Sequence, residues 1–503
     1  MVKINMKYIQ TLLIVFILNI AMSFADDEPP LPIGLSQEDS KSSEEPALPM
    51  GLESSESDEP ELPMGLEPSK EEASDEPALP EGLFSDSKDT QESESAEKPE
   101  FDIPFGLTGF WEARGGLRTR SDPYEKDESI GETRLQLEFE KDLDFASFKL
   151  TSDFLYDPVF DRHVIELEEG KGWIDLREAN VSMTPLSFMD LKLGRQILTW
   201  GTGDMIFIND LFPKDWNSFF IGRDDEYLKA PSDAGKISFY TDIVNMNIVF
   251  TPRFDSDRFI DGRRISYWNG NMLSIAGQNA TVDVDKPDDW MDDYEIAVRL
   301  FKNISGYELA LYGYWGFWKS PGGSDPMTGE AIFPDLAVYG GSIRTNIGKG
   351  IGNLEVGYYD SKDDNEGDDP FIKNDEFRFL IGYEQEIAKE LTAAFQYYVE
   401  YMLDYDDYAD TWFKGVPKTD EFRHVFTLRL TKLLMSQNLK LTLFTYYSPS
   451  DDDAYIRPNA HYKINDNWSA EIGGNFFVGN YDHTFFGQFE RNSNFYVGAR
   501  YSF

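Results

Sequence analysis

The segment 495–503, FYVGARYSF, carries an apolar side chain at every second position. Its apolar positions are Phe495, Val497, Ala499, Tyr501 and Phe503. Because successive side chains of a β-strand point to opposite faces, we expect a strand with one continuous apolar row. A strand of this kind can pair at both edges and close a barrel, so that no backbone group stays unpaired in lipid.

The same alternation recurs along the chain in segments of about ten residues. The segments 376–384, 391–401 and 439–447 are clear examples. No stretch after residue 25 approaches 18 uninterrupted apolar residues, so no membrane-spanning helix is expected there. A soluble β-sandwich would alternate in the same way, and the links between the segments are needed to choose between the two folds.

These links alternate between short and long. We predict strands centred near residues 112, 137, 150, 178, 194, 238, 248, 297, 311, 341, 356, 380, 397, 427, 444, 459, 472 and 498. Tight turns are expected near 142–144, 184–186, 302–305, 434–437 and 465–467, with Asp-rich links of roughly 10 to 40 residues between them. This rhythm predicts an all-β fold, a transmembrane antiparallel up-and-down β-barrel of 18 strands over 101–503. The count is 16 if the weakest segments, near 178 and 238, are not strands.

The last strand looks like the terminal strand by which the assembly machinery of the bacterial outer membrane recognises its barrels. This resemblance implies that Tyr501 and Phe503 act as a barrel-assembly signal, and that the barrel contacts outer-membrane lipids. The aromatic-rich segment 312–318 fits the interfacial girdle of such a barrel. Core aromatics of a soluble domain are the alternative explanation.

The segment 193–204, LGRQILTWGTGD, resembles porin-like outer-membrane families with a Gly-Arg-Gln…Trp-Gly strand. These families include barrels associated with exporters of the resistance-nodulation-division class and with carriers resembling lipoprotein-sorting proteins. The resemblance implies a porin-like channel or transporter in the outer membrane of a Gram-negative bacterium. It also implies transport of hydrophobic or lipidic material, in which case the barrel would be the terminus of a periplasmic lipid-transfer system.

The overall composition excludes several classes of function. The chain of 503 residues has a net charge of −46, 15% aromatic residues and no cysteine. The lack of cysteine excludes disulfide frameworks, thiolate metal sites, cysteine nucleophiles and a lipid anchor on cysteine. The negative charge argues against nucleic acid as a partner, because phosphate repels an acidic surface. Acidic chains are usually poor in aromatic residues, so this composition indicates segments of unlike character.

Residues 1–25 are expected to be a secretory signal peptide. Lys3 and Lys7 precede an uncharged stretch over 8–22, and Ser23-Phe24-Ala25 places small residues at the two positions that signal peptidase reads. The apolar run is shorter than the roughly 20 residues of a spanning helix. An uncleaved membrane anchor is the alternative.

Residues 26–100, here called the acidic arm, are predicted to be disordered. They contain 24 acidic residues, 4 lysines, 11 prolines and a single aromatic residue, Phe84. A segment with so few apolar side chains cannot bury enough surface to offset the entropy of ordering it.

A motif, Glu-Pro-x-Leu-Pro-x-Gly-Leu, occurs four times in the acidic arm, at 28–35, 45–52, 59–66 and 76–83. We interpret the copies as docking motifs for a periplasmic protein, such as a lipid carrier or an inner-membrane exporter, strengthened by their high local concentration. A duplicated low-complexity spacer is the alternative. The positions expected to dock are Leu31, Pro32, Gly34, Leu35, Leu48, Pro49, Gly51, Leu52, Leu62, Pro63, Gly65, Leu66, Leu79, Pro80, Gly82 and Leu83.

The strands near 427, 444 and 459 are expected to turn one face toward the lumen. This face carries the basic wall, defined as Arg423, Arg429, Lys440, Arg457, His461 and Lys463. One hypothesis is a path for anions or acidic solutes. The equally weighted alternative is ion pairing inside the lumen with Glu376, Glu384, Glu400 and Glu471.

The link 202–234 is unusually apolar for an exposed loop. Its apolar residues include Ile206, Phe207, Leu211, Phe212, Trp216 and Phe219. Because such a patch is costly to leave in water, we predict that the link folds into the barrel as a constriction. A place in the barrel rim is the alternative.

No catalytic residue, metal site or cofactor is predicted. None of the four histidines forms a pair with zinc-protease spacing, and no Gly-x-Ser-x-Gly motif occurs. Asp runs such as 404–407 and 451–453 lack the ligand spacing of an EF-hand, and solvated external loops explain them better than calcium sites.

Overall fold

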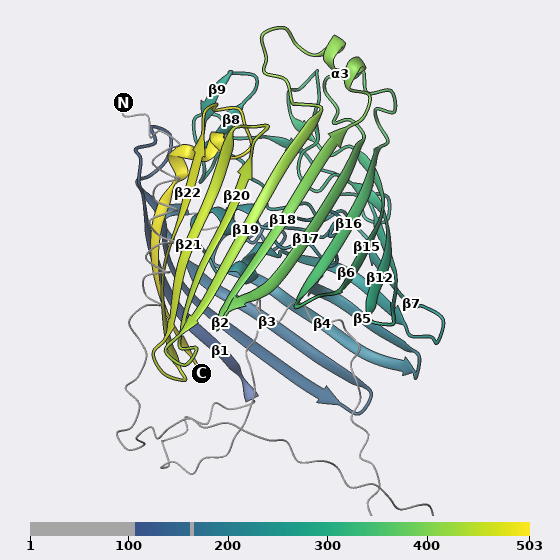
Figure 1. Cartoon of the computed structure of the whole chain (residues 1–503), viewed down its shortest axis with the longest axis vertical. Coiled ribbons are helices and arrows are strands. Elements are labelled where there is room, and N and C mark those ends of the chain that lie inside the picture. The colour runs from purple at the N-terminus through teal and green to yellow at the C-terminus, as the bar shows by residue number, and fades with distance from the viewer. Residues whose placement is uncertain (1–105, 161–164) are drawn as a thin grey trace, which may run out of the picture. The chain divides into compact units, whose positions relative to one another are not determined.

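The computed structural model describes residues 106–160 and 165–503. They form a closed β-barrel with short turns at one end and longer loops at the other (Figure 1). We call these the turn end and the loop end. The predicted signal peptide, the acidic arm and its docking motifs lie outside the described residues.

The barrel wall has 18 strands. They are β1 (Thr108–Arg118), β2 (Glu128–Leu143), β3 (Ala146–Tyr156), β4 (Ile174–Leu186), β5 (Met189–Ile197), β6 (Pro231–Phe239), β7 (Asn245–Thr251), β11 (Glu295–Ile304), β12 (Tyr307–Phe317), β15 (Asp335–Ile347), β16 (Gly350–Ser361), β17 (Glu376–Ala388), β18 (Leu391–Met402), β19 (Phe422–Leu434), β20 (Leu439–Ser448), β21 (Asp453–Lys463), β22 (Trp468–Gly479) and β23 (Asn494–Ser502).

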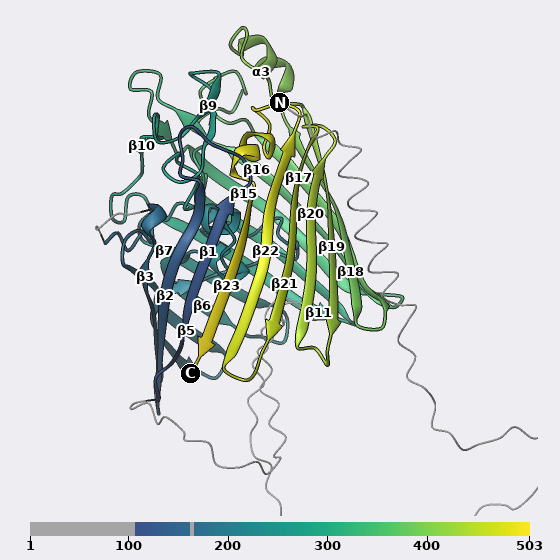
Figure 2. The same cartoon turned by 90° about the vertical axis from the view of Figure 1, so that its left-hand side faces the viewer.

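Each strand pairs antiparallel with the next one along the wall, and the last strand pairs with the first. β23 lies beside β1, as Figure 2 shows, with Ala113 opposite Ala499. The backbone N–H of Phe503 donates to the carbonyl of Gly109 at 3.0 Å, and the N–H of Gly109 donates back at 3.1 Å. The alternating strand at 495–503 therefore closes the barrel.

The predicted fold class is confirmed, with 18 strands rather than 16. Each predicted strand centre falls within a strand, including the weak segments near 178 and 238. Two of the predicted turns lie slightly further along the chain than expected, at 144–145 and 187–188, because β2 continues to Leu143 and β4 to Leu186. Pro185 lies in a register shift between Met183 and Leu186, where a residue without an N–H is tolerated inside a strand.

The connections mostly follow the predicted short and long rhythm. The turn end includes links as short as 144–145 and 305–306, whereas the loop end includes 198–230 and 252–294. One loop-end link departs from the prediction, because β20 and β21 are joined by 449–452 alone. Among the described residues, no helix is long and apolar enough to cross a membrane.

The loop end also contains short elements of its own. They are η2 (Pro158–Phe160), β8 (Tyr267–Asn269), β9 (Ser274–Ala276), β10 (Val284–Asp285), β13 (Gly323–Ser324), β14 (Ala331–Ile332), α3 (Tyr405–Thr411) and η4 (Gly487–Asn492). β8 and β9 pair as a hairpin, and β10, β14 and β13 form a small sheet.

The outer face of the wall is apolar. Alternate side chains such as Phe377 and Ile381 on β17 are exposed, and the intervening Leu380 is fully buried. Trp111 and Trp468 contact each other near the turn end, with ring centroids 6.5 Å apart. Trp315 and Tyr339 contact each other near the loop end, with ring centroids 5.9 Å apart. Aromatic residues at both edges of an apolar band are typical of a barrel that spans a membrane.

Candidate functional site

The link between β5 and β6, residues 198–230, bends into the barrel, and we call it the inner loop. It contains α2 (Trp216–Ile221) and η3 (Asp225–Leu228). The Asp215 carboxylate caps α2 by accepting a hydrogen bond from the N–H of Ser218 at 2.7 Å. Gly222 ends the helix with a φ of 86°, where a side chain would be strained. The chain reverses there, and the inner loop contacts both sides of the wall.

The first part of the inner loop, residues 202–209, is here called the pore lobe. The Gln396 side chain on β18 both donates to the carbonyl of Asp204 and accepts from its N–H, each at 2.8 Å. The Tyr446 hydroxyl on β20 donates to the carbonyl of Met205 at 2.7 Å. The Tyr359 hydroxyl on β16 donates to the carbonyl of Ile208. Inward side chains of three strands therefore satisfy the lobe's backbone groups.

Helix α2 packs against the wall and against η4 through aromatic rings. The Phe220 ring lies 5.1 Å from Phe477 and 4.9 Å from Phe489, measured between centroids. Phe219 lies 5.7 Å from Tyr455. This packing explains why the inner loop is apolar although it is not part of a strand.

The residues of the predicted constriction all lie in the inner loop. Leu211, Phe212 and Phe219 are buried, and Ile206, Phe207 and Trp216 are half-buried. Trp216 contacts the rings of both Phe207 and Phe219. Phe219 also contacts Tyr455, an inward residue of the wall.

The acidic turn after α2 faces arginines of the wall. Arg457 on β21 pairs with Asp225, with Nη2 and Oδ1 2.8 Å apart. Arg500 on β23 lies 3.5 Å from both Asp224 and Glu226. Burial raises the pKa of Glu226 to about 7, and the Asp224 charge adds to the rise while Arg500 opposes it.

The pore lobe also forms an ion pair with an arginine of the wall, through Asp204. Oδ1 of Asp204 lies 2.6 Å from Nη2 of Arg429 on β19. Burial raises the pKa of Asp204 to about 6, with Arg429 opposing the rise and the Glu384 and Asp225 charges adding to it. A carboxyl group that titrates near neutral pH therefore lies at the contact between lobe and wall.

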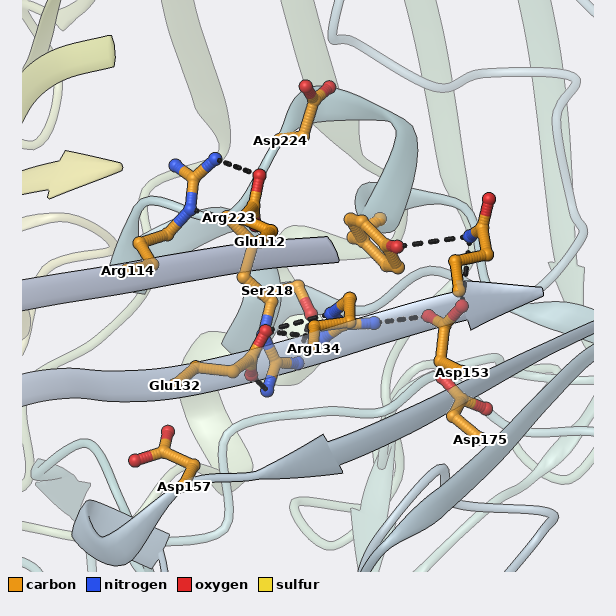
Figure 3. Close-up of polar contacts among 12 residues, drawn as sticks. Glu112, Arg114, Glu132, Arg134, Asp153, Asp157, Asp175, Ser218, Arg223 and Asp224 are labelled. Atoms are coloured by element: carbon orange, nitrogen blue, oxygen red, sulfur yellow. Dashed lines mark hydrogen bonds and ion pairs between the residues drawn. The ribbon is translucent and has the colours of Figure 1, made fainter. Parts of the chain in front are cut away.

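A network of buried ion pairs covers the wall on the β1–β4 side (Figure 3). Arg134 pairs with Glu132 at 2.8 Å and with Asp153, and all three side chains are buried. Arg223 of the inner loop donates to the same Glu132 at 2.5 and 2.9 Å. The Tyr227 ring lies 4.0 Å from the Arg134 guanidinium. Ion pairs therefore connect the inner loop to the β1–β4 side of the wall as well.

This network was missed by the sequence reasoning, although a signal was present. A carboxylate two residues before an arginine lies on the same face of a strand. This spacing gives ion pairs within single strands for Glu112–Arg114, Glu132–Arg134, Asp175–Arg177 and Glu376–Arg378.

The basic wall lies on the neighbouring strands β19, β20 and β21. Arg423 pairs with Glu400 at 3.0 Å and with Asp451 at 2.6 Å. Arg429 and Arg457 contact the inner loop, as described above. Lys440, His461 and Lys463 follow toward the turn end.

Of the four glutamates considered as partners for the basic wall, Glu400 forms an ion pair with it, through Arg423. Glu376 pairs instead with Arg378 at 2.6 Å, and Glu471 pairs with Arg114 at 2.8 Å.

A cavity of about 380 Å³ lies at the loop end, between the inner loop and the links that precede β4 and follow β7. Charged side chains of both signs line it, among them Lys171, Asp215, Arg223, Arg258, Asp261 and Arg263. Arg258 donates to both carboxylate oxygens of Asp175, at 2.8 and 2.9 Å. Within the described residues, no group of three or more histidines and carboxylates is arranged to hold a metal ion.

No protein-family model matches the chain, and no curated protein matches it. Solved structures with a similar barrel include OccK11 (OpdR) of Pseudomonas aeruginosa, at 9% identity and a TM-score of 0.46, covering 79% of this chain and 95% of that one. OccAB4 of Acinetobacter baumannii is 11% identical with a TM-score of 0.47, and the match covers 79% of this chain and 97% of that chain. A mutant porin of Rh. blastica is 11% identical with a TM-score of 0.34, and the match covers 79% of this chain and 99% of that chain.

Proposed function

We propose that the chain is a porin-like channel of the outer membrane that passes small polar solutes, with the inner loop as its constriction. The observation that carries this proposal is the inner loop itself, which bends into a closed 18-stranded barrel and contacts β16, β18 and β20 on one side and β1 and β2 on the other. A barrel of this strand number is wide enough for an aqueous lumen, and an inward loop narrows it.

The charged lining favours polar over hydrophobic solutes. Ion pairs line the wall beside β1–β4, and the cavity at the loop end carries charges of both signs. A hydrophobic solute would have to displace water from these groups without replacing its hydrogen bonds, which is costly.

The basic wall supports a preference for anions in the part of the lumen toward the turn end. Arg429 and Arg457 hold the inner loop, so part of their charge is matched by Asp204 and Asp225. Lys440, His461 and Lys463 lie further toward the turn end, where Lys463 is 3.4 Å from Asp466. Lumen charges of one sign raise the local concentration of oppositely charged solutes.

The proposal places the turn end and the acidic arm in the periplasm, and the four repeats of the arm dock a periplasmic partner. The repeats also support a second candidate function. In that function the barrel is the outer-membrane terminus of a periplasmic lipid-transfer or export system, acts mainly as a binding module, and need not conduct ions.

Swelling of proteoliposomes in a series of sugars of increasing size tests the channel. Small sugars should enter vesicles that contain the barrel, with a sharp size limit set by the inner loop. Replacing residues 202–209 by a short Gly-Ser linker should raise that limit. Vesicles that exclude every sugar, although the barrel is folded, would rule out the channel in favour of the second function.

A further inference from the structure

A single carboxylate on the wall holds both ends of the pore lobe. Glu355 on β16 is 1% exposed. Its Oε2 accepts hydrogen bonds from the N–H of Thr202 at 2.7 Å, the hydroxyl of Thr202 at 3.0 Å and the N–H of Gly203 at 3.1 Å. Its Oε1 accepts from the N–H and the side-chain amide of Asn209, both at 2.9 Å. Donors from the two ends of the lobe thus converge on one side chain.

Glu355 and the pore lobe depend on each other. A buried carboxylate is costly unless hydrogen bonds replace its water, and the donors that do so here come from the lobe. If the lobe moved away, the charge of Glu355 would lose these donors. If Glu355 were absent, the N–H groups of Thr202 and Asn209 would lose their acceptor.

The wall around Glu355 is shaped to receive the ends of the lobe. Asn353, two residues before Glu355, donates from its side-chain amide to the carbonyl of Thr202 at 2.8 Å. The Asn209 amide also donates to the carbonyl of Val356 at 3.1 Å. On β15, a β-carbon at Gly340 would lie 1.7 Å from Oδ1 of Asn209, so a glycine is required for this close approach.

The lobe residues between these two ends lie against other strands. Asp204 contacts Arg429 on β19, and Met205 accepts from Tyr446 on β20. Phe207 is half-buried and contacts the inner loop itself, where the ammonium group of Lys214 lies 4.7 Å from the ring centroid. Because the ends are fixed at Glu355, the position of this middle part is fixed as well.

We propose that Glu355 is a positioning residue of the channel: it fixes how far the pore lobe reaches into the lumen, without contacting the solute. The proposal rests on the proposed channel function. Conductance and ion selectivity therefore depend on a residue that the solute does not touch.

The test compares Glu355→Gln with Glu308→Gln in the full chain. An amide cannot accept hydrogen bonds on its nitrogen, so one end of the lobe would meet a donor instead of an acceptor. Glu308→Gln removes the same charge from the wall, at a carboxylate that lies 3.8 Å from Arg344 and not at the lobe. In planar bilayers, Glu355→Gln should conduct more, with a noisier open state, and Glu308→Gln should resemble the parent.

A second readout does not depend on conduction. The chain has no cysteine, so Phe207→Cys introduces a single thiol in the middle of the lobe. A water-soluble maleimide should label this thiol about tenfold faster or more when Glu355→Gln is added, since loss of charged hydrogen bonds shifts the lobe toward released conformations. Adding Glu308→Gln should leave the labelling rate unchanged.

The possible outcomes are distinct. If Glu355→Gln speeds labelling and the parent does not conduct, the positioning role is supported and the channel is rejected. Labelling and conductance that both match the parent in folded Glu355→Gln would overturn the proposal. If Glu355→Gln does not fold, Asn209→Ala replaces it, because this loop substitution removes one donor to Glu355 and leaves all strands unchanged. It should change both readouts in the same direction, and parent-like values would equally overturn the proposal.

Discussion

Arg457 of β21 and Asp225 of the inner loop form an ion pair that joins the barrel wall to a segment inside it, with 2.8 Å between Nη2 and Oδ1. The same guanidinium lies over the ring of Phe219, 4.1 Å from its centroid. One arginine of the basic wall thus holds both α2 and the acidic turn that follows it. The basic wall therefore holds the inner loop in place, in addition to any effect of its charge on a solute.

The basic wall makes a prediction about ion selectivity. Replacing Arg423, Arg429 and Arg457 together by Gln should reduce the preference for anions, measured as the reversal potential of single channels in a salt gradient. Arg378→Gln, on β17 outside the basic wall, serves as the control. Selectivity that is the same in the triple variant and the parent would contradict a selective role for the wall.

Asp204 predicts a dependence on pH. Its pKa of about 6 lies above the ordinary value of 3.8, so the folded state binds more protons than the unfolded chain between these values. The unfolding free energy contributed by this group therefore falls as pH rises through that window and is constant above it. Below about pH 6 the carboxyl is neutral, and the charge of Arg429 is no longer matched.

Anion selectivity should accordingly be higher at about pH 5 than at about pH 7, and Asp204→Asn should remove most of this step. Glu226 titrates near pH 7, so a small residual dependence is expected there. If Asp204→Asn shows the same change in anion selectivity between about pH 5 and pH 7 as the parent, another group causes that change.

The buried network on the β1–β4 side makes a prediction about stability. Arg134→Leu leaves Asp153 buried without its cation, which should lower the free energy of unfolding by about 3–5 kcal/mol. Glu132 keeps its pair with Arg223 in this variant. Arg120→Gln breaks a pair with Glu490 at 2.8 Å in which both side chains are about one-third exposed, and should cost less than about 1 kcal/mol. Urea unfolding in detergent, followed by heat-modifiable migration, measures both. Equal losses would contradict the assigned role of burial.

The acidic arm makes a prediction about partners. A peptide of residues 26–100 should retain a periplasmic protein, and replacing the Leu-Pro pairs of all four repeats by Ser-Ala should abolish this retention. A reordered peptide of the same composition controls for charge. If all three peptides retain the same proteins, or none, the arm is a spacer.

The strands could be predicted from the sequence because period-2 alternation is local. Each predicted strand centre falls within a strand of the wall, including the weak segments near 178 and 238. Strand ends were less certain, as Pro185 illustrates, because a proline at a register shift looks like a turn in sequence.

The position of the inner loop could be predicted only in outline. Its apolar side chains indicated a place away from water, but not the groups it contacts. Thr202 and Glu355 are 153 residues apart in sequence, and Asp225 and Arg457 are 232 apart. Nothing in the local pattern links such residues. The carboxylate-x-Arg spacing of β1 and β2 was local and was available in the sequence, but its meaning depends on knowing which face is inward.

Single-channel recording of the purified full chain in planar bilayers distinguishes an open channel from a barrel that does not conduct. We expect discrete, stable conductance steps in the parent, and larger steps when residues 202–209 are replaced by a short Gly-Ser linker. Bilayers that stay silent with folded parent protein, and stay silent after the lobe is removed, would contradict a channel.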